Sequence, residues 1–122
     1  MKLINKTKLK TSSIRVMLYD YAHKAHISTR GVIVELRTAR QCIHGLCIPD
    51  HRAIFLWLFP ETKSQDMAFI WVHELQHLAP KNRRLYALGY ACKGQINANK
   101  KAEQVVGIKL SNITWRSKKC EY

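Results

Sequence analysis

Apolar side chains recur at helical spacing in four segments of the chain. From about residue 12 to residue 27 they return every three or four positions, which predicts an amphipathic helix. Segment 63–79 lies between two prolines and is apolar on most of its surface, which predicts a buried helix. Segment 84–90 predicts a short helix within a linker region, and segment 97–110 predicts a last helix.

Three strands are predicted between the first two helices. Segment 32–38 alternates polar and apolar residues near its end and is rich in β-branched side chains. Segment 41–49 predicts a second strand, in which Gly45 is a candidate bulge. Segment 52–59 is apolar on both faces, which is typical of a strand that is covered on both sides. The order is therefore helix, three strands, buried helix, linker and final helix, which indicates an α+β fold.

Length and composition indicate one globular domain over residues 1–122. Hydrophobic residues make up 47% of the chain, which excludes a disordered protein. Residues 1–11 are expected to form a basic N-terminal extension, and residues 111–122 are expected to form a basic C-terminal tail. No segment has the apolar length of a membrane span or of a signal-peptide core, which favours a cytoplasmic protein without a membrane span.

The four cysteines are expected to be reduced thiols, because no export signal accompanies them. Cys42 and Cys47 are close enough in sequence to suggest two other interpretations. One is a structural zinc site, which would need a second cysteine pair, and the other is a disulfide, if the chain is secreted. Cys92 and Cys120 do not form such a second pair in sequence, so buried thiols within a sheet are the favoured interpretation.

The sequence WVHELQHLA, at residues 71–79, contains the most informative motif. Residues four apart lie on one face of a helix, so His73 and His77 can both point at one ion, and Glu74 leans toward the same pocket. Two imidazoles at this spacing are a zinc-binding pattern, in which the glutamate after the first histidine is the general base. A chance match is the alternative. However, a buried histidine pair needs polar partners, and a Zn²⁺ ion would supply one.

The motif and the order of elements resemble the zincin metallopeptidases, in particular a gluzincin reduced to its minimum, as in the minigluzincins. The resemblance implies a minimal zincin fold with a backing helix, a small three-stranded mixed sheet, the motif helix and a C-terminal glutamate helix. It implies a zinc-dependent endopeptidase that hydrolyses peptide bonds through a zinc-bound water, with Glu74 as general base. Segment 52–59 is similar to the strand that pairs with an extended protein or peptide substrate in this family.

The third zinc ligand has two candidates in the sequence. A catalytic zinc ion typically keeps three protein ligands and a water. Downstream of His77 the chain has no further histidine and no aspartate, which leaves Glu103 and Glu121 as the carboxylates. Glu103 is favoured because a metal ligand needs rigid support, and it falls within a predicted helix, whereas Glu121 lies in the tail. A surface glutamate paired with a lysine is the alternative interpretation of Glu103.

Two further groups of residues are candidates for roles at the zinc site. Tyr86 and Tyr90, together with Arg84, follow the motif helix and are candidates for supporting the oxyanion, although none has a decisive spacing and a structural role is the favoured interpretation. The tail ends in Cys120 and Glu121, which carry zinc-binding groups, and it is long enough to cross the domain. The tail is therefore a hypothetical inhibitory segment, and a frayed basic terminus is the alternative.

The charge of the chain suggests a second class of function. Lysine and arginine number 21 against 8 acidic residues, a formal net charge of +13, which favours an acidic partner or nucleic acid. No known nucleic-acid-binding motif accompanies these charges, so a basic soluble surface is equally consistent. The alternative function is a basic nucleic-acid-associated protein with a structural zinc site, or a peptidase that acts on nucleic-acid-bound proteins.

Overall fold

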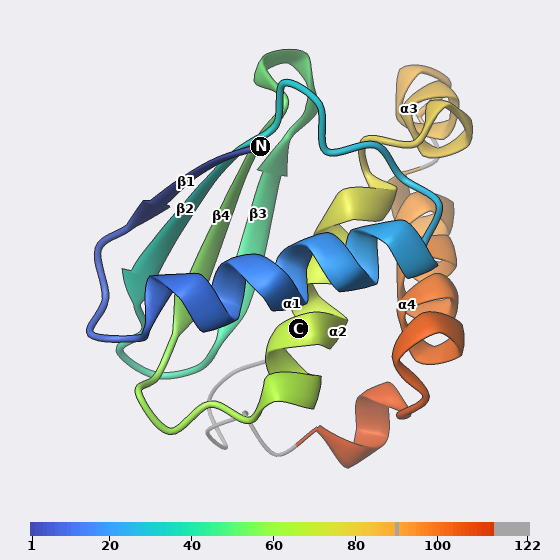
Figure 1. The fold of residues 1–122 in the computed structure, drawn as a ribbon. Coiled ribbons are helices and arrows are strands. Elements are labelled where there is room, and N and C mark those ends of the chain that lie inside the picture. The colour runs from blue at the N-terminus through green and yellow to red at the C-terminus, as the bar shows by residue number, and fades with distance from the viewer. Residues whose placement is uncertain (90, 114–122) are drawn as a thin grey trace.

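A four-stranded mixed sheet forms one side of the protein (Figure 1). The computed structural model describes residues 1–89 and 91–113, without the side chains of residues 86, 87, 91 and 92. The strands are β1 (Lys2–Asn5), β2 (Ile33–Thr38), β3 (His44–Ile48) and β4 (Ala53–Leu58), in the spatial order β1-β2-β4-β3. β2 pairs in parallel with β1 and with β4, whereas β3 pairs antiparallel with β4. The predicted α+β class is confirmed, whereas the predicted number of three strands is wrong.

The additional strand is β1, which lies in the segment that was expected to be an N-terminal extension. It is only four residues long, and its sequence KLIN carries too few apolar residues to predict a strand. It forms because β2 offers an open edge, with Lys2 paired to Ile33 and Asn5 paired to Leu36. Tertiary pairing, rather than local propensity, therefore decides the structure of this segment.

β4 is an interior strand, and β3 is the edge strand beside the motif helix. Both edges of β4 are occupied, because it pairs with β2 on one side and with β3 on the other. Segment 52–59 therefore has no open edge for an extended substrate, and this part of the expectation is wrong. The register of β3 is continuous from His44 to Ile48, so Gly45 is not a bulge. Among the described residues β3 pairs only with β4.

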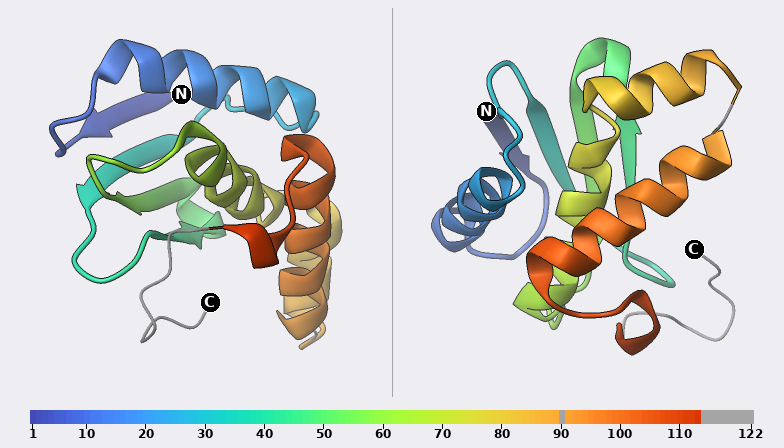
Figure 2. Two further views of the ribbon diagram at one scale, coloured as in Figure 1. Left: turned by 90° about the horizontal axis from the view of Figure 1, so that it is seen from below. Right: turned by 90° about the vertical axis from the view of Figure 1, so that its right-hand side faces the viewer.

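Helices cover one face of the sheet (Figure 2). The inner face carries alternate, fully buried residues of the two central strands, namely Val34, Leu36, Ile54, Leu56 and Leu58. Helices α1 (Thr11–Lys24) and α2 (Ser64–Gln76) contribute buried side chains to the same core. On the outer face, the Arg37 guanidinium lies 4.9 Å from the ring centre of Phe55, and the rings of His44 and Trp57 stack at 4.4 Å. On its inner face β4 therefore packs in the core under the helices, whereas on its outer face Phe55 contacts Arg37 and Trp57 stacks on His44.

α2 is the central helix of the protein. Every residue from Asp66 to Gln76 is buried, as its mostly apolar surface predicts. The indole N–H of Trp71 donates a hydrogen bond of 2.8 Å to the backbone carbonyl of Leu18, which ties α2 to α1. The helix ends three residues earlier than predicted, because the N–H of His77 bonds to the carbonyl of Glu74 in a tightened last turn.

Two further helices follow α2. α3 (Pro80–Ala87) begins at Pro80, the proline before which the preceding helix was predicted to end. This is four residues before the predicted start of the short helix at residue 84. α4 (Ala91–Val106) begins six residues before the predicted segment 97–110 and ends four residues before its end. Gly94 and Asn97 lower helix propensity in the first half of α4, and packing against α2 outweighs that cost. Short 3₁₀ turns, Pro49–His51 and Leu110–Asn112, complete the described elements.

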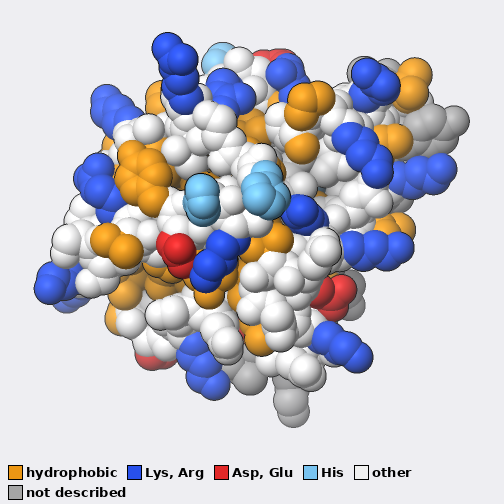
Figure 3. Space-filling model, turned by 45° about the vertical axis from the view of Figure 1, so that its right-hand side comes forward, with side chains coloured by type: hydrophobic (Ala, Val, Ile, Leu, Met, Phe, Trp, Pro, Cys, Tyr) orange, Lys and Arg blue, Asp and Glu red, His pale blue; other side chains and the backbone are white. Residues whose placement is uncertain are grey.

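Basic side chains are distributed widely over the surface. Figure 3 shows lysine and arginine side chains spread over the face that it presents, with few acidic side chains among them. This distribution does not favour nucleic-acid binding over a basic surface, and the nucleic-acid alternative stays a prediction. In the part of the chain that the structure describes, each helix is too short or too polar to cross a lipid bilayer.

Candidate metal centre

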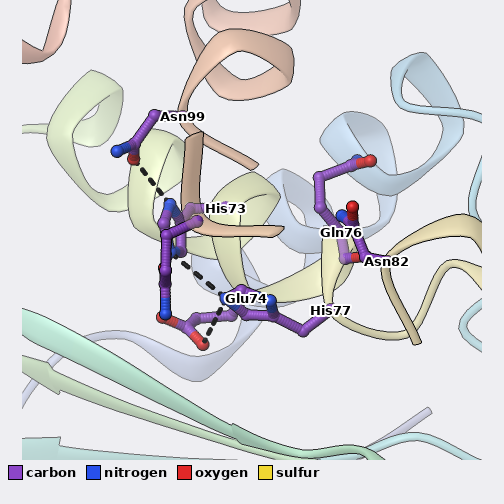
Figure 4. Close-up of polar contacts among 7 residues, drawn as sticks. His73, Glu74, Gln76, His77, Asn82 and Asn99 are labelled. Carbon is purple, nitrogen blue, oxygen red and sulfur yellow. Dashed lines mark hydrogen bonds and ion pairs between the residues drawn. The ribbon is translucent and has the colours of Figure 1, made fainter. Parts of the chain in front are cut away.

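His73, Glu74 and His77 come together inside the protein, as the motif predicts (Figure 4). The Nε2 atoms of the two histidines are 3.3 Å apart, and the rings meet edge to face. The Glu74 carboxylate faces the same point, with one oxygen 3.9 Å from His73 Nε2 and the other 4.0 Å from His77 Nε2. All three residues are buried. Their ligand atoms lie within 4.8 Å of one another, so this group can hold a metal ion.

The spacing of the two imidazoles fits a tetrahedral ion. Two nitrogens bound to zinc at about 2.0–2.1 Å with tetrahedral angles lie about 3.3 Å apart. The observed separation of the two Nε2 atoms is 3.3 Å. A van der Waals contact between two imidazole nitrogens that both carry lone pairs is unfavourable unless a cation or a proton lies between them. The donor set and its spacing therefore fit a metal ion such as zinc.

Burial keeps the site in the protonation state that metal binding requires. Desolvation lowers the pKa of His73, and it lowers the pKa of His77 to about 4, with a further contribution from the neighbouring His73. Both imidazoles are therefore neutral at pH 7, and only a neutral imidazole has a lone pair for a metal ion.

Helix α4 supplies two amides to the first histidine of the motif. The Oδ1 atom of Asn99 lies 2.7 Å from Nδ1 of His73, and the Oε1 atom of Gln95 lies 2.8 Å from Nε2 of the same ring. Figure 4 shows Asn99 beside His73. An amide oxygen only accepts hydrogen bonds, so Asn99 favours a proton on Nδ1 and Gln95 favours one on Nε2, whereas a neutral ring carries only one of the two. A metal ion at Nε2, the atom that faces His77, needs the tautomer that Asn99 favours.

The close approach of α4 has a simple cause in its sequence. Gly94, Ala98 and Ala102 recur every four residues and are all buried, so α4 has a row of small residues on its inner side. Small residues at a helix contact allow the two axes to lie close together. Gln95 and Asn99 lie one position further along the helix, and they therefore reach the edge of the His73 ring.

Gly45 gives the Glu74 side chain its space. Strand β3 runs past α2, and a Cβ atom added at Gly45 would lie 2.6 Å from Cγ of Glu74 and 2.9 Å from Cγ2 of Ile70. Both distances are below any normal contact, so a larger residue would push the Glu74 side chain out of its position. The inward neighbour on the strand is Cys47, whose thiol pKa is raised to about 12 by burial and by the charge of Glu74. Cys47 is therefore a neutral thiol beside the site.

Glu103 does not join the three motif residues. The only cluster of potential metal-binding His, Cys, Asp and Glu side chains in the described part of the chain is His73, Glu74 and His77. A carboxylate oxygen of Glu103 instead accepts a hydrogen bond of 3.1 Å from the backbone N–H of Leu110. This contact holds the chain that follows α4 against the last turn of the helix.

The other predicted site residues are only partly described. Arg84 lies in α3 and is exposed. Tyr86 lies in the same helix, but its side chain is outside the described part of the structure, as is all of Tyr90. Cys120 and Glu121 also lie outside the described residues, so the inhibitory tail stays a hypothesis.

The expectation of reduced cysteines is wrong for one of them. Cys42 is disulfide-bonded. Cys47 is a free thiol, so the alternative of a disulfide between Cys42 and Cys47 is excluded. The expected cytoplasmic location was consistent with four reduced cysteines. Disulfides persist mainly in oxidising compartments, so the disulfide at Cys42 removes this support.

Sequence reasoning missed Gln95, Asn99 and Gly45. Gln95 and Asn99 have the same four-residue spacing as the two histidines, and that spacing was the available signal. It was hidden because the last helix was predicted to begin at residue 97, after Gln95. For Gly45 no signal existed, because the residue that it approaches lies 29 positions away and only the packing of β3 on α2 brings them together.

Comparison with known proteins leaves the family of the chain open. No protein-family model, no curated protein and no solved structure matches the chain.

Proposed function

We propose that the protein is a zinc-dependent peptidase that hydrolyses peptide bonds in protein substrates. One observation carries the proposal: two neutral imidazole Nε2 atoms converge at the separation of tetrahedral ligands, and a glutamate carboxylate faces the same point. A purely structural zinc site fills all four positions with protein ligands. Here a carboxylate lies beside the imidazoles at 3.9 Å and 4.0 Å, close enough to take a proton from a water.

The residues of the site have separate roles in this proposal. His73 and His77 hold the ion, and Asn99 fixes the ring of His73. Bound zinc supplies Lewis acidity, which lowers the pKa of water toward 7 and polarises a peptide carbonyl. Glu74 accepts the proton of the attacking water and later delivers it to the leaving amine. Burial of the carboxylate among apolar residues strengthens its electrostatic interactions.

Strand β3 is the proposed docking edge for the substrate. It is the edge strand of the sheet beside α2, and among the described residues its backbone pairs only with β4. An extended peptide that pairs with such an edge is held by main-chain hydrogen bonds, which carry little sequence specificity. Because Gly45 of this strand contacts Glu74, a peptide paired here would lie next to the general base.

Hydrolysis of an unstructured protein tests the proposal. Casein is incubated with the zinc-loaded protein, with the same protein after treatment with a chelator, and with the chelated protein after zinc is restored. We expect cleavage in the first and third samples only. Zinc content measured in parallel separates a protein that binds no metal from one that binds metal without cleaving casein. Zinc binding without cleavage of casein or of other unfolded proteins would contradict the proposed activity.

Substitution of Gly45 with alanine is expected to reduce hydrolysis by about 10²-fold while zinc binding is retained, because a small displacement of a catalytic group has an effect of this size. The added methyl group meets Glu74 and Ile70, whereas the two histidines are not in its path. Rates of casein cleavage and zinc content are measured for both proteins. The control is Leu46→Ala, which lies next in the strand on the outer face, where the side chain is 48% exposed. Equal rates for Gly45→Ala and the unmodified protein would show that Gly45 does not position Glu74.

A further inference from the structure

We propose that the amide oxygen of Gln95 is the third protein ligand of the metal ion, in place of Glu103, so that the protein ligand set is uncharged. The assignment rests on the proposed metal centre at His73 and His77, and it goes beyond it by replacing the carboxylate ligand with an amide.

The contacts of Gln95 point to the ion site. Its Oε1 atom lies 2.8 Å from Nε2 of His73. His73 Nε2 is in turn 3.3 Å from His77 Nε2. His73 Nε2 is therefore next to both other candidate ligand atoms, His77 Nε2 and Gln95 Oε1. An oxygen bound to zinc at about 2.0–2.2 Å with tetrahedral angles would lie about 3.4 Å from each bound nitrogen, so Gln95 Oε1, at 2.8 Å from His73 Nε2, would move outward by about half an ångström when the ion binds.

The hydrogen bonding of His73 strengthens this assignment. Asn99 Oδ1 accepts a hydrogen bond from Nδ1, so Nε2 of the same ring carries its lone pair toward Gln95 Oε1. Two lone pairs at 2.8 Å repel each other unless a proton or a metal ion interacts with both. A proton on the ring nitrogen would make a buried imidazolium, which is costly, whereas in the metal-free protein a rotated Gln95 amide can donate an N–H to Nε2. A metal ion coordinated by both atoms removes the conflict without charging the ring.

Glu103 lies too far along the helix to take this place. It follows Gln95 by eight residues, which corresponds to about 12 Å along the axis of α4. Its carboxylate is engaged at the other end, where it accepts the hydrogen bond from Leu110 N–H. Gln95 is on the same side of α4, two turns closer to the N-terminus, and it is exposed, which leaves the site accessible. The close packing of α4 on α2 supplies the rigid support that a ligand needs.

An uncharged ligand changes the properties of the ion. A carboxylate would neutralise one of the two positive charges, whereas an amide neutralises none. An ion with only neutral protein ligands is bound more weakly than one with a carboxylate ligand. It is also a stronger Lewis acid, because its ligands donate less electron density to it. Conversion of Gln95 to glutamate should therefore tighten zinc binding, in contrast to its conversion to alanine.

The experiment measures zinc affinity by competition with a chromophoric chelator, using the full chain and single variants. Loss of a residue that supports or binds a metal costs about 10–100-fold in affinity. The zinc affinity of Gln95→Ala should therefore be lower than that of the unmodified protein by at least this factor. Gln95→Glu should bind zinc more tightly than the unmodified protein. Glu103→Ala should change affinity by no more than about 2-fold, as expected of a substitution away from the site. In the cobalt-loaded protein, the visible absorption bands should change for both Gln95 variants and stay the same for Glu103→Ala.

Gln104 offers a matched control for the charge, because it is an exposed glutamine on the same helix. Gln104→Glu adds the same negative charge without a contact to the imidazoles. It should not reproduce the tighter zinc binding that is expected of Gln95→Glu. Urea unfolding of each zinc-free variant verifies that the fold is retained. Equal zinc affinity of Gln95→Ala and the unmodified protein, or a large loss in Glu103→Ala, would overturn the assignment. An unmodified protein that binds no zinc overturns the metal centre itself, and a Gln95-dependent zinc site without casein cleavage overturns only the peptidase activity.

Discussion

Replacement of Glu74 by glutamine is expected to leave zinc bound and to reduce peptide hydrolysis by about 10²–10⁴-fold, the contribution of a positioned general base. Glutamine has the shape of glutamate, so it fits the space that Gly45 leaves open. Its amide cannot accept a proton at neutral pH, so the water loses its base. The two imidazoles that hold the ion are unchanged in this variant.

Zinc content, the rate of casein cleavage and the urea midpoint are measured for Glu74→Gln and for the unmodified protein. Glu61→Gln is a suitable control, because it removes one negative charge from an exposed position in the loop before α2. This control should retain both zinc and activity. Cleavage at the normal rate by Glu74→Gln would end the assignment of Glu74 as general base, and loss of zinc by this variant would make it a ligand instead.

Replacement of His77 by alanine is expected to lower zinc affinity by more than about 100-fold, because removal of a direct ligand should exceed the 10–100-fold effect of removing its supporting partner. Hydrolysis should be lost together with the ion. His77 caps the end of α2 and is 5% exposed, so the zinc-free variant also needs a check of its fold by circular dichroism. The measurement is chelator competition at fixed pH.

His51→Ala provides the matched control, because His51 is an exposed histidine at the end of the 3₁₀ turn Pro49–His51. Its removal should leave zinc affinity unchanged. Equal affinity of His77→Ala and His51→Ala would show that the ion, if bound, lies elsewhere. A fall in affinity for both variants would indicate that zinc binds to surface histidines rather than to the motif.

The sequence predicted those features that depend on neighbours a few residues away. The pairing of His73 with His77 follows from the 3.6-residue period of a helix, and the burial of α2 follows from its apolar composition. The alternation and the β-branched residues of segment 32–38 predicted a strand, which the structure places at Ile33–Thr38. In each case the side chains that matter are brought together by the geometry of one element.

Only the tertiary structure decided which elements meet. Strand β1 exists because β2 has an open edge, and the order β1-β2-β4-β3 puts β3 rather than β4 at the edge beside α2. Neither fact has a local signature, because strand pairing joins residues that are far apart in the chain.

The same reason explains why Glu103 is not beside the motif histidines and why Gln95 is the proposed third ligand. The sequence left Glu103 as the best carboxylate, and the choice assumed that the ligand had to be charged. The early start of α4 and its row of small residues bring Gln95 and Asn99, rather than Glu103, to the ring of His73. The motif thus determined by itself where a metal ion can bind, while the packing of α4 on α2 determined which other side chains surround it, because helix contacts depend on side-chain sizes along both helices.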